Sequence, residues 1–124
     1  MDLEIVRDYC LAKVGTTESF PFDEHTLVFK VMGKMYALIA LERIPLQINL
    51  KCEPELAIDL RERYPESVLP GYHMSKVHWN TIILEAELSE KQILEMIDHS
   101  YDLITSKLTK ALKIELDRLR TNIS

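Results

Sequence analysis

The segment from Pro70 to Leu84 holds the residues best suited to binding a ligand. Beside a Pro-Gly turn it carries two histidines, a lysine and the only tryptophan of the chain: His73, Lys76, His78 and Trp79. Ammonium and imidazole groups donate hydrogen bonds to phosphate or carboxylate oxygens, so these side chains suit contacts with an anion. An indole ring either anchors a core or stacks on a base or a peptide, and for Trp79 we favour the core. Because scaffolds present binding residues on loops, we interpret this segment as the working surface.

The histidines and cysteines do not form a recognised metal or catalytic pattern. His73 and His78 with the distant Cys52 would make a weak zinc set, with no carboxylate ligand indicated nearby. Cys52 also lacks a nucleophile motif around it. The three glycines are too far apart to form a phosphate-cradling loop. We therefore expect a non-enzymatic protein with no metal and no cofactor.

Composition indicates one soluble globular domain spanning residues 1–124. Apolar residues make up 47% of the chain and charged residues 28%, which is ordinary for a globular protein. The first thirty residues lack the basic start and apolar run of a secretion signal, and we expect no membrane span. The two cysteines are far apart in sequence and are expected to be reduced thiols. We expect a cytoplasmic location, and no oligomeric state follows from the sequence.

The charge is unevenly distributed. The formal net charge is −5, but residues 25–52 carry +3 and residues 67–84 carry +1, which leaves −9 for the rest. Non-specific affinity for DNA comes chiefly from Lys and Arg, so these two segments are the candidate contact regions. The predicted nucleic-acid-binding residues are Lys30, Lys34, Arg43, Lys51 and Lys76, assisted by His73 and His78.

The first half of the chain predicts a helix followed by three strands. Asp2 caps a helix over 2–14 that ends at Gly15. An extended entry segment over 16–23 follows, and its Phe20 and Phe22 are expected in the core. Alternating apolar residues predict strands over 27–31, 35–41 and 46–51, with a tight turn at Gly33 and Lys34 between the first two. Polar residues of these strands are expected to share one face: Lys30, Gln47, Asn49 and Lys51.

The second half predicts a helix, a strand and a long helical region. The first helix covers 54–64, with Arg61 and Arg63 on its solvated side together with Asp59 and Glu62. Residues 68–71 break the chain, residues 72–78 form a short strand plus turn or a loop, and residues 79–84 form a strand. A capping box at Ser89 starts the last region, which bends near 106–109. We predict an α+β fold, an antiparallel sheet covered on one face by helices.

Several runs of residues resemble the MmcQ/YjbR family. They are Tyr9 to Lys13, Phe20 to Phe22, Lys34 to Ala37, Asn49 to Ala57 and Pro70 to Thr81. The resemblance extends from Leu3 to Leu119. Its most specific part is a His-x-x-Lys-x-His-Trp-x-Thr motif at His73, Lys76, His78, Trp79 and Thr81.

The resemblance implies a YjbR-like fold with the order α-β-β-β-α-β-β-α, similar to type III secretion chaperones. It also implies a "double wing" arrangement in which two hairpins bind DNA. The sequence departs from the family pattern at Val14, Glu53 and Thr109. All three positions lie at predicted element ends and leave the motif intact.

Three functional hypotheses follow. The first is a non-enzymatic DNA-binding domain that uses the basic residues named above and the His-x-x-Lys-x-His-Trp segment. The second is a chaperone-like module that binds a protein or peptide through its sheet or acidic helices, which the negative net charge favours. The third is a small-ligand protein with a pocket at Lys51, His73 and Lys76.

Overall fold

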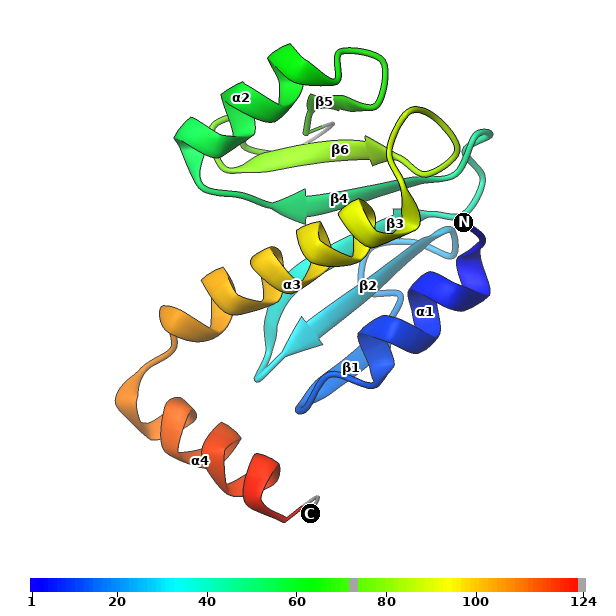
Figure 1. Ribbon diagram of the computed structural model, residues 1–124. Coiled ribbons are helices and arrows are strands. Elements are labelled where there is room, and N and C mark those ends of the chain that lie inside the picture. The colour runs from blue at the N-terminus through cyan, green and yellow to red at the C-terminus, as the bar shows by residue number, and fades with distance from the viewer. Residues whose placement is uncertain (72–73, 123–124) are drawn as a thin grey trace.

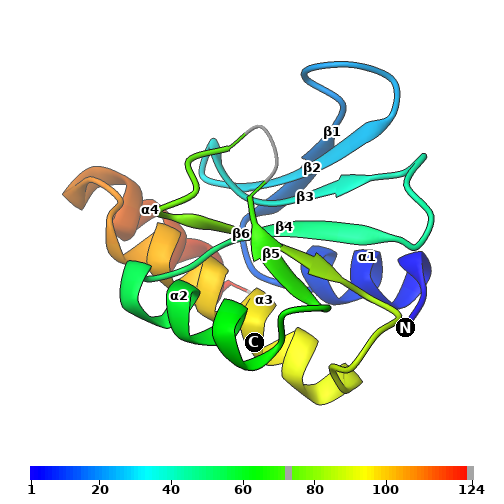
Figure 2. The same ribbon diagram turned by 90° about the horizontal axis from the view of Figure 1, so that it is seen from above.

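The computed structural model describes residues 1–71 and 74–122 and confirms an α+β fold. A six-stranded antiparallel sheet has the strand order β1-β2-β3-β4-β6-β5. The helices lie on one face of this sheet (Figures 1 and 2). In chain order the elements are α1 (Leu3–Leu11), β1 (Thr16–Ser19), β2 (Thr26–Val31), β3 (Lys34–Ala40), β4 (Gln47–Lys51), α2 (Pro54–Arg63), β5 (Val68–Pro70), β6 (Trp79–Ile83), α3 (Glu90–Ser106) and α4 (Lys110–Thr121).

The helix starts follow from capping residues that the sequence identified. The Asp2 carboxylate accepts the Ile5 N–H at 2.9 Å and starts α1. Ser89 and Gln92 form the predicted reciprocal capping box at the start of α3. The predicted bend is also confirmed, because α3 ends at Ser106 and Thr109 caps a separate helix, α4.

The predicted tight turn between β2 and β3 is present but lies one residue earlier than expected, at Met32 and Gly33, because Lys34 already belongs to β3. Met32 and Gly33 have φ angles of 50° and 82°. Positive φ at both central residues is the signature of a hairpin turn whose twist matches that of the flanking strands. This turn brings Lys30, near the end of β2, beside Met35 of β3.

One short edge strand, β1, is added to the order that the family resemblance implies, whereas the other edge strand, β5, is the first of the two strands expected after α2. Strand β1 pairs with β2 and occupies the start of the predicted entry segment. Strand β5 covers residues 68–70, where the sequence indicated a chain break, and its Pro70 is tolerated because the strand lies at the sheet edge. The core prediction for Phe20 and Phe22 is wrong: the rings are 48% and 63% exposed. Both residues follow β1 in a surface loop, where neither ring reaches the helix-covered face.

The core has a large part and a small part. The large cluster includes Phe29, Ile48 and Ile97 and contains buried residues from the sheet, α1, α3 and α4. The small cluster joins Val28, Leu38 and Trp79, residues that alternate with the large cluster along their strands and so face the other side of the sheet. Trp79 is 8% exposed, so its predicted core position is confirmed.

A buried serine of α3 fixes the end of β4. Ser100 is completely buried, and its hydroxyl accepts the Lys51 N–H at 2.9 Å while donating to the Tyr36 carbonyl at 2.5 Å. The hydroxyl thus bridges β3 and β4 where the ladder between them ends at Leu50 and Ala37. The backbone of Lys51 is therefore held in place by the long helix. Within the described residues, no helix is long and apolar enough to cross a membrane.

Candidate functional site

Four of the predicted basic residues lie at one end of the sheet, which we call the basic end. Lys30 and Lys34 flank the β2–β3 turn. Lys51 is the last residue of β4 and pairs with Trp79, the first residue of β6. Lys76 lies three residues before the start of β6 in an exposed loop. Since neighbouring strands are about 4.8 Å apart, β2 and β4 place their lysines roughly 10 Å apart across β3.

Arg61 of α2 holds the loop that carries Lys76 and His78. Its guanidinium donates to Asn80 Oδ1 at 2.7 Å, to the Trp79 carbonyl at 3.4 Å, and to the Lys76 carbonyl. The prediction that Arg61 lies on the solvated side of its helix is therefore wrong: the residue is half-buried and its charge satisfies loop carbonyls. The Lys76 and His78 side chains remain exposed.

Lys107 joins the basic end and was missed from the sequence. It is the C-cap residue of α3, and its charge acts on Lys51. Burial and the nearby Lys107 ammonium together lower the pKa of Lys51. The sequence predicted a bend at this point but gave no sign that the bend would lie beside β4.

Among the residues that the structure describes, the lysines of the basic end have no ion-pair partner, whereas most arginines have one. Within residues 1–71 and 74–122, no ion pair is formed by Lys30, Lys34, Lys51, Lys76 or Lys107. Other cations are paired with carboxylates: Arg7 with Glu18, Lys13 with Asp98, Arg63 with Asp59, Arg118 with Glu115 and Arg120 with Asp117. The basic end is therefore a concentration of uncompensated positive charge.

Two predicted site residues do not join this set. Arg43 follows β3 at the opposite end of the sheet, and six residue steps along β3 already span about 20 Å. It lines a groove there with His25 and Glu42. His73 lies outside the residues that the structure describes.

The motif residues after the loop are structural. Trp79 packs in the small cluster. The Thr81 hydroxyl donates to Asn49 Oδ1 at 2.5 Å across β6 and β4. Asn49 thus lies on the sheet face opposite Ile48, as the predicted alternation requires, and bonds across the sheet.

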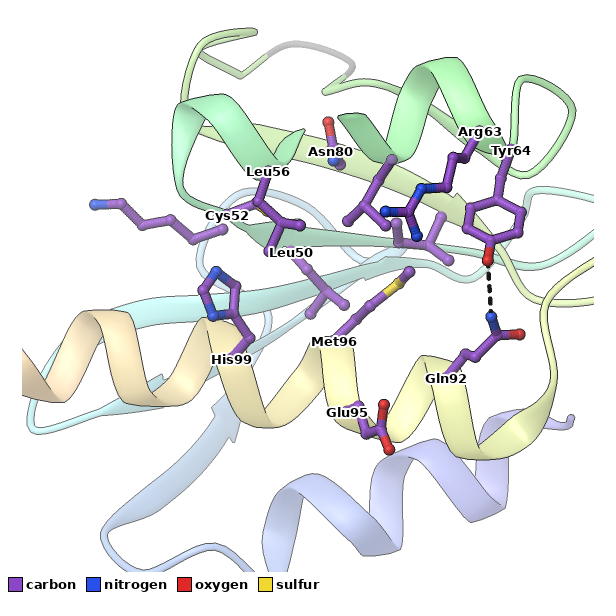
Figure 3. A pocket seen from close by; sticks show the side chains of 13 residues that line it. Leu50, Cys52, Leu56, Arg63, Tyr64, Asn80, Gln92, Glu95, Met96 and His99 are labelled. Atoms are coloured by element: carbon purple, nitrogen blue, oxygen red, sulfur yellow. Dashed lines mark hydrogen bonds between the residues drawn. The ribbon is translucent and has the colours of Figure 1, made fainter. Parts of the chain in front are cut away.

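A pocket of about 270 Å³ lies next to the basic end, between α2 and α3 (Figure 3). Lys51 lines it, as the small-ligand hypothesis predicted, but Lys76 does not, and His73 is not described. Burial raises the pKa of the Cys52 thiol to about 11, so the thiol stays protonated and weakly nucleophilic at neutral pH. The Cys52 backbone N–H, rather than its thiol, contacts the His78 carbonyl at 2.8 Å. Among the described side chains, no three His, Cys, Asp or Glu residues converge as metal ligands.

Comparison with known proteins identifies the family. The sequence model of the YjbR family matches residues 11–103, which is most of the chain and includes the loop before β6. The chain belongs to the YjbR family. The uncharacterized protein YjbR of Escherichia coli K12 is 34% identical over 102 residues, which cover 82% of this chain and 85% of the relative. The uncharacterized protein YyaQ of Bacillus subtilis is 34% identical over 106 residues, 73% of this chain and 87% of the relative.

Solved structures of YjbR-like chains share the fold. The crystal structure of Deinococcus radiodurans protein DR2400, described as a DUF419 domain, superposes with a TM-score of 0.87 at 40% sequence identity. The match covers 93% of this chain and 87% of that one. A crystal structure of a Pseudomonas syringae protein gives a TM-score of 0.69 at 30% identity and covers 83% of this chain and 98% of that one.

Proposed function

We propose that this YjbR-family domain binds DNA without catalysing a reaction on it. The observation that supports the proposal is the basic end, where the ammonium groups of five lysines have no ion-pair partner in the described chain: Lys30, Lys34, Lys51, Lys76 and Lys107. Cations that are not neutralised within the protein are free to neutralise phosphates. His78 adds an exposed imidazole beside Lys76.

The arrangement fits phosphate contacts better than base readout. The five lysines come from a turn, a strand end, a loop and a helix end, so they surround one end of the sheet. Lysine is a mobile point charge that suits phosphate contacts, whereas base readout relies on side chains held in a groove. The binding is therefore independent of sequence and modest, with a Kd on the order of 10⁻⁴ to 10⁻⁶ M. The acidic remainder of the chain weakens it further.

Removing two central lysines tests the proposal. The double variant Lys51→Ala/Lys76→Ala should lower the affinity for a fluorescently labelled duplex at low salt by about tenfold or more, measured by anisotropy. The matched control is Arg43→Ala/Lys91→Ala, which removes the same charge from the opposite end of the sheet and from the start of α3. Equal loss in the two variants would show that only net charge matters and would contradict a site at the basic end.

One further observation favours a second candidate, binding of a protein or peptide. A groove of about 680 Å³ on the other end of the sheet is lined by the exposed Phe22 together with Leu38 and Met74. An apolar aromatic left in water beside a groove is typical of a peptide contact. Phe22→Ser should abolish capture of a protein partner and leave DNA binding unchanged, which separates the two candidates.

A further inference from the structure

The pocket between α2 and α3 is built mainly from apolar side chains. Its floor is β4 and β6, and its walls are the facing sides of the two helices (Figure 3). Helix α2 buries only Ala57 completely, so it stands away from α3 along most of its length. The apolar lining residues are Leu50, Cys52, Leu56, Leu60, Ile82 and Met96. The apolar part of a ligand bound here would leave water and contact the aliphatic and sulfur-containing side chains of the lining.

One side of the pocket is closed by a hydrogen bond. Gln92 Nε2 donates to the Tyr64 hydroxyl at 3.1 Å and links α3 to the end of α2 (Figure 3). Toward the C-terminal part of α3 the lining changes to Lys51 and His99. The pocket therefore has an apolar middle, a closed side and a polar side.

Among the described lining residues, Lys51 is the one cation without an ion-pair partner. Arg63 also lines the pocket, but its guanidinium is paired with Asp59 at 3.0 Å. Lys51 has no such partner among the described residues. Glu95 is the carboxylate of the lining, and Figure 3 shows its side chain directed away from Leu50 and Cys52. The charge at this side suits a monoanion.

His99 supplies a second donor beside Lys51. Its Nε2 accepts the Glu53 N–H at 3.4 Å, so in the neutral ring the proton lies on Nδ1. Figure 3 shows the ring on the pocket side of α3, next to Cys52. Lys51 and His99 both line this side, so a bound carboxylate would meet an ammonium for one oxygen and a ring N–H as a donor for the other.

The volume limits the size of the ligand. An engineered apolar cavity of about 150 Å³ holds benzene, and drug-sized ligands occupy roughly 300 Å³ or more. At about 270 Å³ this pocket accommodates more than one benzene ring but less than most drug-sized molecules. A six-carbon chain or one substituted ring with a small head group fits these limits.

We propose that this pocket binds a small monocarboxylic acid with an apolar body, its carboxylate on Lys51 and His99 and its body against Leu56, Leu60 and Met96. A phosphate monoester is a poorer match because it carries about two negative charges, and Lys51 alone among the described lining residues is a cation without an ion-pair partner. The pocket shares Lys51 with the basic end, but its apolar lining residues are not among the proposed DNA contacts, so hexanoate binding is expected whether or not the domain binds DNA.

The test uses hexanoate and hexylamine as probes of equal length and opposite charge. Binding is followed by NMR of methyl-labelled methionine and leucine, with Met96→Leu to assign the Met96 methyl. Hexanoate should cause saturable shifts at Leu56, Leu60 and Met96, with a Kd on the order of 1 mM. Hexylamine should bind at least about tenfold more weakly because its ammonium faces Lys51.

Variants separate the charge from the cavity. Lys51→Met should weaken hexanoate binding about tenfold, whereas Lys34→Met, which removes a basic-end charge outside the pocket, should leave it unchanged. Leu56→Phe fills the pocket from a residue that is 38% exposed, and it should abolish the shifts while the rest of the spectrum keeps its dispersion. Equal binding of the two probes, wild-type affinity in Lys51→Met, or no saturable shifts in the pocket would each overturn the proposal.

Discussion

The Arg61 guanidinium donates to Asn80 Oδ1 at 2.7 Å and so ties helix α2 to strand β6. The same side chain also donates to the carbonyls of Lys76 and Trp79. Asn80 is 1% exposed, so its amide must find its partners inside the protein. One half-buried arginine thereby positions both the exposed loop of the basic end and one wall of the pocket.

Replacing Arg61 by methionine should destabilise the protein and loosen the loop. The change keeps most of the side-chain volume but leaves the buried Asn80 acceptor and the Lys76 carbonyl without this donor, at a cost of roughly 1–3 kcal/mol, while the Trp79 carbonyl keeps the Gly71 N–H at 2.9 Å. Urea unfolding measures the loss, and hydrogen exchange should show faster exchange of the amides over 76–79. Arg63→Met is the control: its exposed pair with Asp59 contributes less than about 0.5 kcal/mol. Similar losses in both variants would contradict the anchoring role.

Gly71 lies where no side chain fits. A Cβ added there would be 2.8 Å from the Trp79 Cβ and 2.9 Å from the Trp79 carbonyl oxygen. Gly71→Ala should therefore cost roughly 1–3 kcal/mol of unfolding free energy, because backbone has to move. The comparison is Gly33→Asn in the β2–β3 turn, where nothing lies within 4 Å and asparagine tolerates positive φ. A smaller loss at Gly71 than at Gly33 would show that the contact with Trp79 is not close.

Trp79 should behave as a core residue in solution. Its ring packs against Val28 and Leu38 and is 8% exposed. Iodide should quench its fluorescence poorly, and Trp79→Ala should lower stability by roughly 3–5 kcal/mol. Ready quenching with little loss of stability would instead place the ring in solvent, where it could stack on a base.

Because both cysteine thiols are buried, we expect the protein to lose stability at alkaline pH. Burial raises the pKa of Cys52 to about 11 and that of Cys10 to about 12, from an ordinary value of 9.0. The folded state therefore holds both thiol protons more tightly than the unfolded state does. The contribution of the two thiols to the free energy of unfolding is complete below pH 9 and is lost as the pH rises toward 11 and 12. Urea midpoints measured from pH 8 upward should fall with pH, and less steeply in Cys10→Ala/Cys52→Ala. Parallel slopes in the two proteins would refute the assignment to the thiols.

Local signals predicted the main elements of the fold because they act over a few residues. The carboxylate of Asp2, the capping box at Ser89 and the positive φ at Gly33 each depend on neighbours in sequence. The edge strand β1 was harder to predict, since its Thr16–Ser19 run has no apolar alternation. The wrong core position of Phe22 has the same origin: hydrophobicity alone does not tell whether a loop turns toward the core.

The candidate site was predicted only in part because it depends on distant contacts. The lysines of the hairpin and of the loop were identifiable as local excesses of charge. Lys107 was not, because its proximity to Lys51 follows from the length and direction of α3. Arg43 had the right charge but lies at the other end of the sheet, since each strand reverses the direction of the chain. The type of a residue indicates which contacts its side chain can make, whereas strand register and helix direction determine which side chains lie close together.

The salt dependence of duplex binding is the measurement that tests the DNA-binding proposal most directly. Each phosphate contact contributes about −0.9 to the slope of log K against log salt, so four of the five lysines in contact predict roughly −3 to −4. Lys51→Ala/Lys76→Ala should reduce the magnitude of the slope by about two units while folding is nearly unchanged, and Arg43→Ala/Lys91→Ala should leave the slope as in the wild type. Undetectable binding at low salt, or a slope that the basic-end variant does not change, would contradict the account.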